Sequence, residues 1–377
     1  MKVHITLVGG QPAPVYHGIV ATKPDKVVYV YSKESLTSLT ALRNEVRILE
    51  DEYPELDATD AIAILNRAEE MAEKYKDEEV TVNISSGTKP WTYLFGKVFD
   101  RRPNAMVFYM DQNNVLWNYS TMQTQKDFPF DMDVLFRLYG NPLKHFRRLS
   151  DYTQQDTDAV NMIEKMRRYQ YAQFNQLLSV LKKPWSNQLA QDDFGRFELE
   201  NGAYVEWVKG DFVRIGLVQA KRGLREETIA SPHCVDLAFS SGWFEYRIAN
   251  MISHWHHAQD IMLNCIFPPK SKPSDTRFPK NEIDIIVNAG SKILFVECKT
   301  KINTSTDIDK FRNAVKNYGG TGSKALFITE EPMNFKEIEK CRESQIIYFS
   351  LKDQQYGPNK EQELFKLLNN ELNIINT

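Results

Sequence analysis

The first ~120 residues alternate short β-rich runs with stretches of helical periodicity, and this alternation restricts the fold more than any other feature. Between the runs, apolar residues recur at helical spacing, most clearly after Asp57 and Thr59, either of which could cap a helix. Alternating strands and helices favour a parallel sheet with helices on both faces. We therefore predict a doubly wound α/β domain with strands over His4–Gly9, Val27–Ser32, Val80–Ser85, Met106–Asp111 and Val115–Tyr119, and helices over Leu36–Leu49, Thr59–Lys76 and Lys89–Phe99.

A connector of different character follows this pattern. Residues 121–155 have weak periodicity and are expected to form a linker, after which Asp158–Leu181 is typical of one long helix. Asn201-Gly202 lies between two alternating runs, which predicts a hairpin with a two-residue type I′ turn. The connector is therefore expected to be a small helical and β module.

The C-terminal residues return to a mixed α/β pattern. A helix over Trp243–His257 precedes strands over Ile261–Phe267, Glu282–Asn288 and Lys292–Cys298, and Ala289-Gly290 joins the last two strands. We expect a division into residues 1–150 (the N-terminal domain and its linker), 151–231 (the connector) and 232–377 (the second α/β domain).

The charge balance excludes one class of protein. The 377 residues carry 47 Lys and Arg against 50 Asp and Glu, a formal net charge of −3, whereas non-specific nucleic-acid binders have a clear basic excess. A mean hydropathy of −0.47, without an apolar run near ~20 residues or a signal-peptide pattern, predicts a cytoplasmic protein with no membrane partner. Four widely spaced cysteines without a CxxC pair argue against a disulfide framework and a structural zinc site.

Three charged residues stand within the nearly continuous apolar strands of the C-terminal domain. Asp284 lies on one strand of the predicted hairpin, and Glu297 and Lys299 follow on the other, where period-2 geometry puts them on one face. Two carboxylates around a divalent ion, with an ammonium group beside them, suit hydrolysis of a phosphodiester. The alternative is a salt bridge on an exposed edge. A fourth candidate is Glu245, on the helix that begins Gly242-Trp243-Phe244, where a lone Glu is as readily a solvated residue as a ligand.

The sequence GWFE, followed by NEID and VECKT, resembles the PD-(D/E)xK restriction-endonuclease-like superfamily, and within it the nuclease domain of a CRISPR ancillary nuclease family. The resemblance covers residues ~232–350 and implies a restriction-endonuclease-like fold and a site that binds Mg²⁺ or Mn²⁺. It implies catalytic roles for Asp284, Glu297, Lys299 and Glu245, with the three carboxylates as metal ligands. The sequence departs from the superfamily pattern in that no proline precedes Asp284, but members of the superfamily often lack this proline, and Glu282 is an additional possible metal ligand.

Two loops of the N-terminal domain follow strands at the edge where open α/β sheets bind ligands. One is the segment 9–14, and the other is Ser85-Ser86-Gly87-Thr88-Lys89, which offers hydroxyls, backbone N–H groups, a helix N-terminus and a cation. Such a loop can bind an anion, although an ordinary helix-capping turn has the same composition. The absence of GxGxxG and Walker A sequences gives little support to NAD binding or ATP hydrolysis.

The stretch VNISSGTKPW resembles the signature loop of the CRISPR-associated Rossmann fold (CARF) domain, over residues 1 to ~125. The resemblance implies a Rossmann-like CARF domain that binds cyclic oligoadenylates across a homodimer interface. A two-fold dimer can present the same loop twice to a symmetric ring, and cyclic tetra-adenylate is the expected ligand. The implied ligand contacts are Gly10, Gln11, Ser32, Lys33, Ser86, Gly87, Thr88 and Lys89.

Together these patterns predict a homodimeric, metal-dependent endonuclease that a cyclic oligoadenylate activates and that cleaves DNA and/or RNA in type III CRISPR defence. A ligand-controlled nucleic-acid-binding regulator and a ring nuclease that degrades the effector remain open. Two basic stretches, Lys209–Arg225 and the loop 268–280, could contact a nucleic-acid backbone or could be solvated surface, and we favour the loop. His254, His256 and His257 lack a regular metal-ligand spacing and are expected to pack at the surface.

Overall fold

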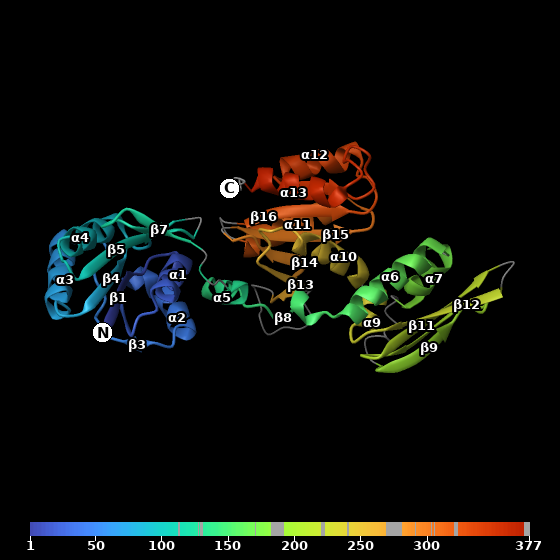
Figure 1. The fold of residues 1–377 in the computed structure, drawn as a ribbon, viewed down its shortest axis with the longest axis horizontal. Coiled ribbons are helices and arrows are strands. Elements are labelled where there is room, and N and C mark those ends of the chain that lie inside the picture. Colours follow the sequence, from blue (N-terminus) through green and yellow to red (C-terminus); the bar gives the residue numbers. More distant parts are fainter. Residues whose placement is uncertain are drawn as a thin grey trace.

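The computed structural model describes residues 1–111, 114–126, 128, 131–169, 171–181, 192–219, 223–239, 241–268, 281–290, 292–302, 304, 306–319 and 323–372. Three sheets are spread along an elongated molecule (Figure 1). The N-terminal sheet lies at one end, a small sheet of the connector lies at the other, and the C-terminal sheet lies between them.

The N-terminal sheet has seven strands in the order β3-β2-β1-β4-β5-β6-β7. The strands are β1 (Lys2–Leu7), β2 (Lys26–Val30), β3 (Leu49–Glu50), β4 (Glu79–Asn83), β5 (Ala105–Met110), β6 (Leu116–Asn118) and β7 (Gln123–Gln125). The first five in this order pair in parallel, and β6 and β7 pair antiparallel, so the predicted doubly wound sheet is confirmed.

Helices cover both faces of this sheet. They are α1 (Pro12–Thr22), η1 (a 3₁₀ turn, Lys33–Ser35), α2 (Leu36–Glu45), α3 (Ala61–Lys74) and α4 (Lys89–Phe99). Ile64 of α3 and Trp91 of α4 are buried in one apolar cluster, whereas Val15 of α1 and Leu39 of α2 are buried in another. The central strand β1 is buried from both sides, which explains why nearly every residue in it is apolar or hydrogen-bonded.

Several predicted boundaries in this domain are wrong. The helix expected over Leu36–Leu49 ends at Glu45, because Val46 is extended and the chain then pairs with β2 as the short strand β3. Asp60 caps α3, since its carboxylate accepts from the backbone N–H groups of Ile62 and Ala63, while Asp57 forms the preceding turn. Helix α1 was not predicted.

The segment expected to be a linker contains helix α5 (Met132–Leu138) and strand β8 (His145–Arg148), and a 3₁₀ turn, η2 (Leu149–Asp151), follows. Helix α5 is shared between two apolar cores. Met132 and Phe136 belong to the core of the C-terminal sheet, whereas Val134 and Leu138 belong to that of the N-terminal domain. Strand β8 pairs antiparallel with a strand of the C-terminal sheet. The segment predicted to be a linker is therefore part of the packed structure of both domains.

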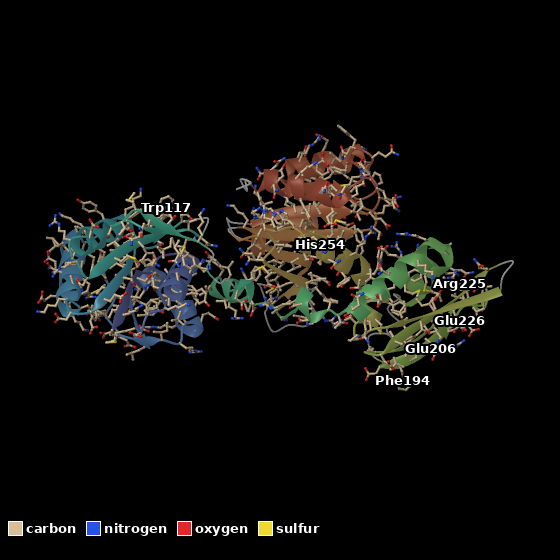
Figure 2. All side chains as sticks on the ribbon, viewed as in Figure 1. Trp117, Phe194, Glu206, Arg225, Glu226 and His254 are labelled. Carbon is tan, nitrogen blue, oxygen red and sulfur yellow. The ribbon has the colours of Figure 1, made fainter. Side chains whose placement is uncertain are left out.

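The connector begins with helical residues on both sides of position 170, α6 (Gln154–Tyr169) and α7 (Tyr171–Leu181), in the region where a helix over Asp158–Leu181 was predicted. The start is earlier because Asp156 accepts hydrogen bonds from the backbone and hydroxyl of Thr153. Four antiparallel strands follow in the order β12-β11-β10-β9. They are β9 (Phe194–Glu198), β10 (Tyr204–Val208), β11 (Phe212–Gln219) and β12 (Gly223–Ala230), and the side chain of Phe194 is exposed on the outer strand (Figure 2).

The predicted hairpin joins β9 and β10, but its turn differs from the prediction. Leu199 N–H donates to Ala203 O and Gly202 N–H donates to Leu199 O, which closes a three-residue loop. Gly202, with φ of 82°, is left-handed, whereas Asn201 is not. The two-residue type I′ turn was therefore wrong, because it would need both residues to be left-handed.

The C-terminal sheet has six strands in the order β17-β16-β15-β14-β13-β8. Its later strands are β13 (Asp260–Phe267), β14 (Asn281–Asn288), β15 (Ile293–Lys299), β16 (Ser323–Thr329) and β17 (Ile347–Ser350). The helices of this part are α9 (Cys234–Phe239), α10 (Gly242–Ser253), α11 (Thr306–Tyr318), α12 (Phe335–Glu343) and α13 (Lys360–Glu371). Residues of α9, α10 and α13 are buried on one face, and residues of α5, α11 and α12 on the other. Helix α10 ends at Ser253, four residues before the predicted end at His257.

Candidate functional site

The two central strands of the C-terminal sheet separate at Asp284. Strands β14 and β15 pair from Asn288–Ile293 to Ile285–Val296, and Asp284 is the next residue along β14. Its Oδ2 accepts a hydrogen bond of 2.7 Å from the backbone N–H of Cys298. The Asp284 side chain therefore replaces a backbone acceptor where the ladder ends, and this fixes the position of its carboxylate.

Glu297 and Lys299 meet Asp284 at the same point. The Nζ atom of Lys299 lies 2.6 Å from Oε1 of Glu297 and 3.6 Å from Oδ2 of Asp284. The alternate residues Val296 and Cys298 are buried in the core on the opposite face of β15. Two carboxylates and one ammonium group thus converge in a largely buried position.

Burial and mutual repulsion oppose ionisation of these carboxylates. Burial, followed by the charge of Asp284, raises the pKa of Glu297 to about 8, although Lys299 lowers it. Burial also raises the pKa of Asp284, against the opposing effects of Lys299 and the Cys298 N–H group. Burial alone would lower the pKa of Lys299, but Asp284 and Glu297 hold it above its ordinary value. The site carries more carboxylate than one ammonium group neutralises.

Glu245 and Glu282 lie around these three residues. Burial, then the charges of Asp284 and Glu282, raises the pKa of Glu245 well above its ordinary value. The carboxylate of Glu245 forms no hydrogen bond or ion pair with the part of the chain that the structure describes. Glu282 is exposed at the start of β14, two residues before Asp284. The charges of Glu282 and Asp284 act on Glu245, so both glutamates are electrostatically part of the site.

The donor set can be compared with the needs of a metal ion. Among the described residues, no three His, Cys, Asp or Glu side chains are grouped so that they alone could hold a metal. Mg²⁺ is commonly held by one or two carboxylates, with water and substrate phosphate completing its coordination. Asp284 and Glu297 are such a pair, and a divalent cation would relieve their repulsion, so the residues present fit this kind of site.

The two loops predicted at the N-terminal sheet are in contact with each other. Gly9 N–H donates to Ser86 Oγ at 3.1 Å, and a Cβ on Gly9 would lie 2.6 Å from the backbone nitrogen of Gly87. Gly87 has φ of 86°, which favours glycine. Thr88 caps α4, since its hydroxyl accepts from Trp91 N–H and donates to Ala58 O. Lys89, the first residue of α4, is exposed and forms no ion pair with the described residues.

A cavity of about 660 Å³ lies between this edge of the N-terminal domain and the C-terminal domain. Gly10, Gln11 and Ser85 line it, but Ser86, Gly87, Thr88 and Lys89 do not. The predicted contacts Ser32 and Lys33 also lie outside it, at the start of the 3₁₀ turn η1, where Ser32 caps the turn and its Oγ donates to Glu34. The structure therefore brings only part of the predicted ligand set to this cavity.

Three further residues line this cavity, and no sequence pattern pointed to them. Tyr139, directly after α5, donates from its hydroxyl to Gln11 Oε1 at 2.8 Å. Asn114 Nδ2 donates to the carbonyl of Gly290, in the β14–β15 turn, at 3.1 Å. Asn114 Oδ1 lies 3.0 Å from Nδ1 of His17, whose pKa burial lowers to about 4. Their pairing depends on distances between residues that are far apart in the chain.

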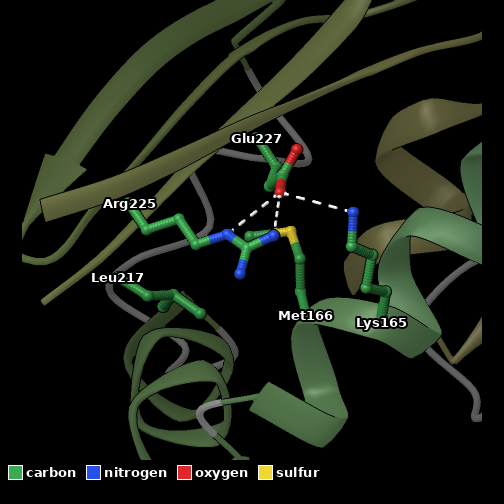
Figure 3. Close-up of a pocket in the computed structure, with 5 residues that line it drawn as sticks. All are labelled: Lys165, Met166, Leu217, Arg225 and Glu227. Atoms are coloured by element: carbon green, nitrogen blue, oxygen red, sulfur yellow. Dashed lines mark hydrogen bonds and ion pairs between the residues drawn. The ribbon is translucent and has the colours of Figure 1, made fainter. Parts of the chain in front are cut away.

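The basic stretch Lys209–Arg225 faces carboxylates in the structure. Arg225 lies 2.8 Å from Glu227, which Lys165 of α6 also approaches at 3.8 Å (Figure 3). The other described basic residues of this stretch are paired similarly, Lys209 with Asp193 and Arg214 with Glu206. The surface here is therefore of mixed charge. The loop 268–280, which we favoured as a backbone contact, lies outside the described residues except for its first residue.

The histidines after α10 make local contacts. His254 Nδ1 lies 2.9 Å from Glu361 Oε1, and the rings of His256 and His257 are 3.6 Å apart. Within the described residues, no helix combines the length and apolar character that crossing a membrane requires.

Comparison with known proteins identifies the N-terminal part of the chain. Residues 3–135 match the family described as the Card1 CARF domain, and no curated protein matches the sequence. Among solved structures, Can2 from Sulfobacillus thermosulfidooxidans in complex with cyclic tetra-adenylate has a similar fold, with 14% identity, a TM-score of 0.62 and 99% coverage of both chains. Protein VC1899 from Vibrio cholerae is similar at 15% identity, with a TM-score of 0.69 and 98% coverage of both chains.

A type III CRISPR defence DNA nuclease activated by cyclic oligoadenylate is also similar, at 16% identity with a TM-score of 0.55. The alignment covers 97% of the present chain but only 51% of that nuclease. Residues 3–135 thus match the Card1 CARF domain family, and the chain shares a common fold with these proteins over nearly its whole length.

Proposed function

We propose that this protein is a nuclease activated by a cyclic oligoadenylate. In this proposal, residues 1–150 form the effector-binding domain and linker, residues 151–231 the connector, and residues 232–377 a PD-(D/E)xK nuclease domain. The Card1 CARF match supports the effector class, and the similar fold of Can2, solved with cyclic tetra-adenylate, supports a ring of four adenylates. The substrate would be DNA and/or RNA, as the similarity to a cyclic-oligoadenylate-activated DNA nuclease suggests.

One observation carries the nuclease assignment: Asp284, Glu297 and Lys299 converge where β14 and β15 separate. A salt bridge alone would need one carboxylate for one ammonium group. Here a second buried carboxylate shares the same lysine, although burying unpaired charge is costly. An excess of buried carboxylate is typical of a site that binds a cation. Ionisable groups with strongly shifted pKa values, such as these, cluster at catalytic sites.

The proposed chemistry divides between these residues and a cation. Asp284 and Glu297 would hold Mg²⁺ or Mn²⁺, with Glu245 and Glu282 as further candidate ligands. When bound, the ion would acidify water and offset charge on the phosphate. Lys299 would orient the attacking water and stabilise negative charge that develops on the phosphate oxygens. The Cys298 N–H group holds the Asp284 carboxylate in place at 2.7 Å.

The effector would bind at the carboxyl edge of the N-terminal sheet. Gly10 and Gln11 line the cavity there, and Ser86, Gly87 and Lys89 lie on the adjacent loop. Because Lys89 is exposed without an ion pair among the described residues, it is available to a phosphate. A homodimer would present two such loops to a ring with rotational symmetry, and ligand binding would favour the active arrangement of the nuclease domains.

The test compares Lys299→Met with Lys301→Met, an exposed lysine two residues further along the chain. Cleavage of a panel of DNA and RNA is measured with Mn²⁺ or Mg²⁺, with and without each cyclic oligoadenylate. We expect Lys299→Met and Glu297→Gln to lower the stimulated rate by about 10²–10³-fold. The Lys301→Met variant should keep its activity.

Binding of the effector is measured on the same variants. We expect both nuclease-site variants to keep wild-type affinity for cyclic tetra-adenylate, which would show that they are folded. Full stimulated cleavage by Lys299→Met or Glu297→Gln would refute the site. Lys89→Ala should weaken effector binding and leave the nuclease site intact, and unchanged binding would remove Lys89 from the effector site.

A further inference from the structure

The cavity of about 660 Å³ has walls from both domains. Its N-terminal wall includes Gln11 and Asn114, and its C-terminal wall includes Gly290 of the β14–β15 turn and the end of α11. Its volume is within the ~300–1,000 Å³ that small-molecule sites occupy. A ligand bound at Gln11 would therefore lie against the nuclease domain as well as against the CARF domain.

Two lysines of the C-terminal wall line this cavity. Lys292 follows the β14–β15 turn, and Lys316 lies in the last turn of α11. Neither forms an ion pair with a carboxylate in the described ranges. A lysine in the last turn of a helix is favoured by the helix dipole, so Lys316 alone would not indicate a ligand. Lys292 belongs to a different element, however, and it lines the same cavity.

Asp111 supplies the carboxylate in the lining of the cavity. Both of its oxygens accept hydrogen bonds from residues that follow closely in the chain. Its Oδ1 accepts from the backbone N–H of Val115 at 2.9 Å, and its Oδ2 accepts from the indole N–H of Trp117 at 3.2 Å. The other polar groups around the cavity include Asn114, Tyr139 and the buried His17, whose pKa is lowered to about 4 by burial. The lining as a whole thus suits a ligand with negative charge and hydrogen-bonding groups.

We propose that Lys292 and Lys316 contact phosphates of the same cyclic oligoadenylate that the Gln11 loop contacts. This inference rests on the proposed function, because it takes the effector class from the CARF domain. It adds that the nuclease domain forms one wall of the effector site. The two lysines would contribute directly to the affinity for the effector through charge-assisted contacts.

Such a site would couple effector binding to the arrangement of the domains. The walls are joined by the hydrogen bond from Asn114 to Gly290 and by α5, which packs in both cores. A ligand that contacts both walls binds most tightly at one particular distance between the two domains. Its binding therefore stabilises the arrangement of the domains that has this distance. The turn that carries Gly290 and Lys292 joins β14, which carries Asp284, to β15, which carries Glu297. A ligand held against this turn would therefore contact the same strands that form the nuclease site.

The experiment measures the affinity of the full-length protein for cyclic tetra-adenylate by titration calorimetry at fixed ionic strength. The variants are Lys292→Glu, Lys316→Glu and the double variant. Lys310→Glu is the matched control, because Lys310 is an exposed lysine on α11 that does not line the cavity. We expect about tenfold weaker binding for each single variant, a larger loss for the double variant, and a change below twofold for the control. The losses should shrink at high salt.

Three outcomes would overturn the inference or its basis. If the wild type binds the effector and both cavity variants bind equally well, the lysines are not part of the site, whereas the proposed function stands. If Lys310→Glu loses as much affinity as Lys316→Glu, the effect is one of overall charge and the inference is wrong. If the wild-type protein binds no cyclic oligoadenylate, the proposed function itself fails. Lys292→Met and Lys316→Met remove the positive charge without introducing a negative one. Each should weaken effector binding, but by less than the corresponding Lys→Glu variant.

Discussion

Two buried histidines should make the N-terminal domain sensitive to mild acid. His4 lies in the central strand β1, and its Nδ1 is 2.9 Å from Thr22 Oγ1 and 3.0 Å from Thr81 Oγ1. His17 lies in α1 beside Asn114. Burial lowers the pKa of His4 to about 3 and that of His17 to about 4, from an ordinary value of 6.5. Both rings are therefore neutral in the folded protein at pH 5, whereas in the unfolded chain they are charged.

The size of the effect follows from proton linkage. Below pH 6.5 the unfolded state binds more protons than the folded state, so the free energy of unfolding falls as pH falls. Each histidine contributes a slope of about 1.4 kcal/mol per pH unit until its folded-state pKa is reached. Because the unfolded imidazole is only half protonated at pH 6.5, the loss between pH 6.5 and 4.5 is about 2.2 kcal/mol from each histidine and about 4.5 kcal/mol from both. This is comparable with the whole stability of many domains, which is about 5–15 kcal/mol.

The measurement is hydrogen exchange of the β1 and β4 amides in the full-length protein between pH 6.5 and 4.5, corrected for the intrinsic exchange rate. This window lies above the range in which carboxylates with lowered pKa, such as Asp51, begin to bind protons. His4→Asn and His17→Asn keep a polar group near the position of Nδ1, and each should remove about half of the slope. The reasoning would be refuted if the variants and the wild type had the same pH dependence.

The remaining predictions concern stability at two positions. Gly87→Ala should lower the free energy of unfolding by about 1–3 kcal/mol, because φ is 86° and the new Cβ would meet Leu7 and Trp91 at 3.0 Å. Gly96→Ala, on the neighbouring helix, meets no atom within 4 Å and should be neutral or stabilising in the same urea titration, so equal losses would contradict the argument. Phe136→Ala should cost about 3–5 kcal/mol, because the ring is 2% exposed and contacts Phe267 and Phe295 edge to face. A loss below about 1 kcal/mol would mean that α5 does not support the C-terminal core.

The sequence predicted those parts of the fold that depend on local pattern. The span of α4 was predicted without error, because Thr88 and Lys89-Pro90 mark its start and apolar residues recur along it. The meeting of Asp284 with Glu297 and Lys299 could be expected from strand periodicity and a short turn. Helix α1 was missed because Pro12 and Pro14 look like loop residues, although proline is well tolerated in the first turn of a helix.

The parts that could not be predicted depend on contacts between distant segments. Strand β8 is recognisable only through its pairing with β13, more than one hundred residues later. The same holds for the hydrogen bond of Tyr139 with Gln11 and for that of Asn114 with Gly290, the second of which joins the two domains. The hairpin turn was wrong for a local reason, since Asn-Gly also occurs in three-residue loops in which only glycine is left-handed.

Because α5 contributes side chains to both apolar cores, the two domains have no clean boundary at which the chain can be cut. A truncation after residue 131 would remove Val134 and Leu138 from the N-terminal core, and a C-terminal fragment that starts after residue 138 would lack Met132 and Phe136. Either fragment would expose apolar surface and tend to aggregate. Recombining this N-terminal domain with a different C-terminal domain would therefore require a partner whose sheet accepts the same face of α5, which limits how freely such domains can be exchanged.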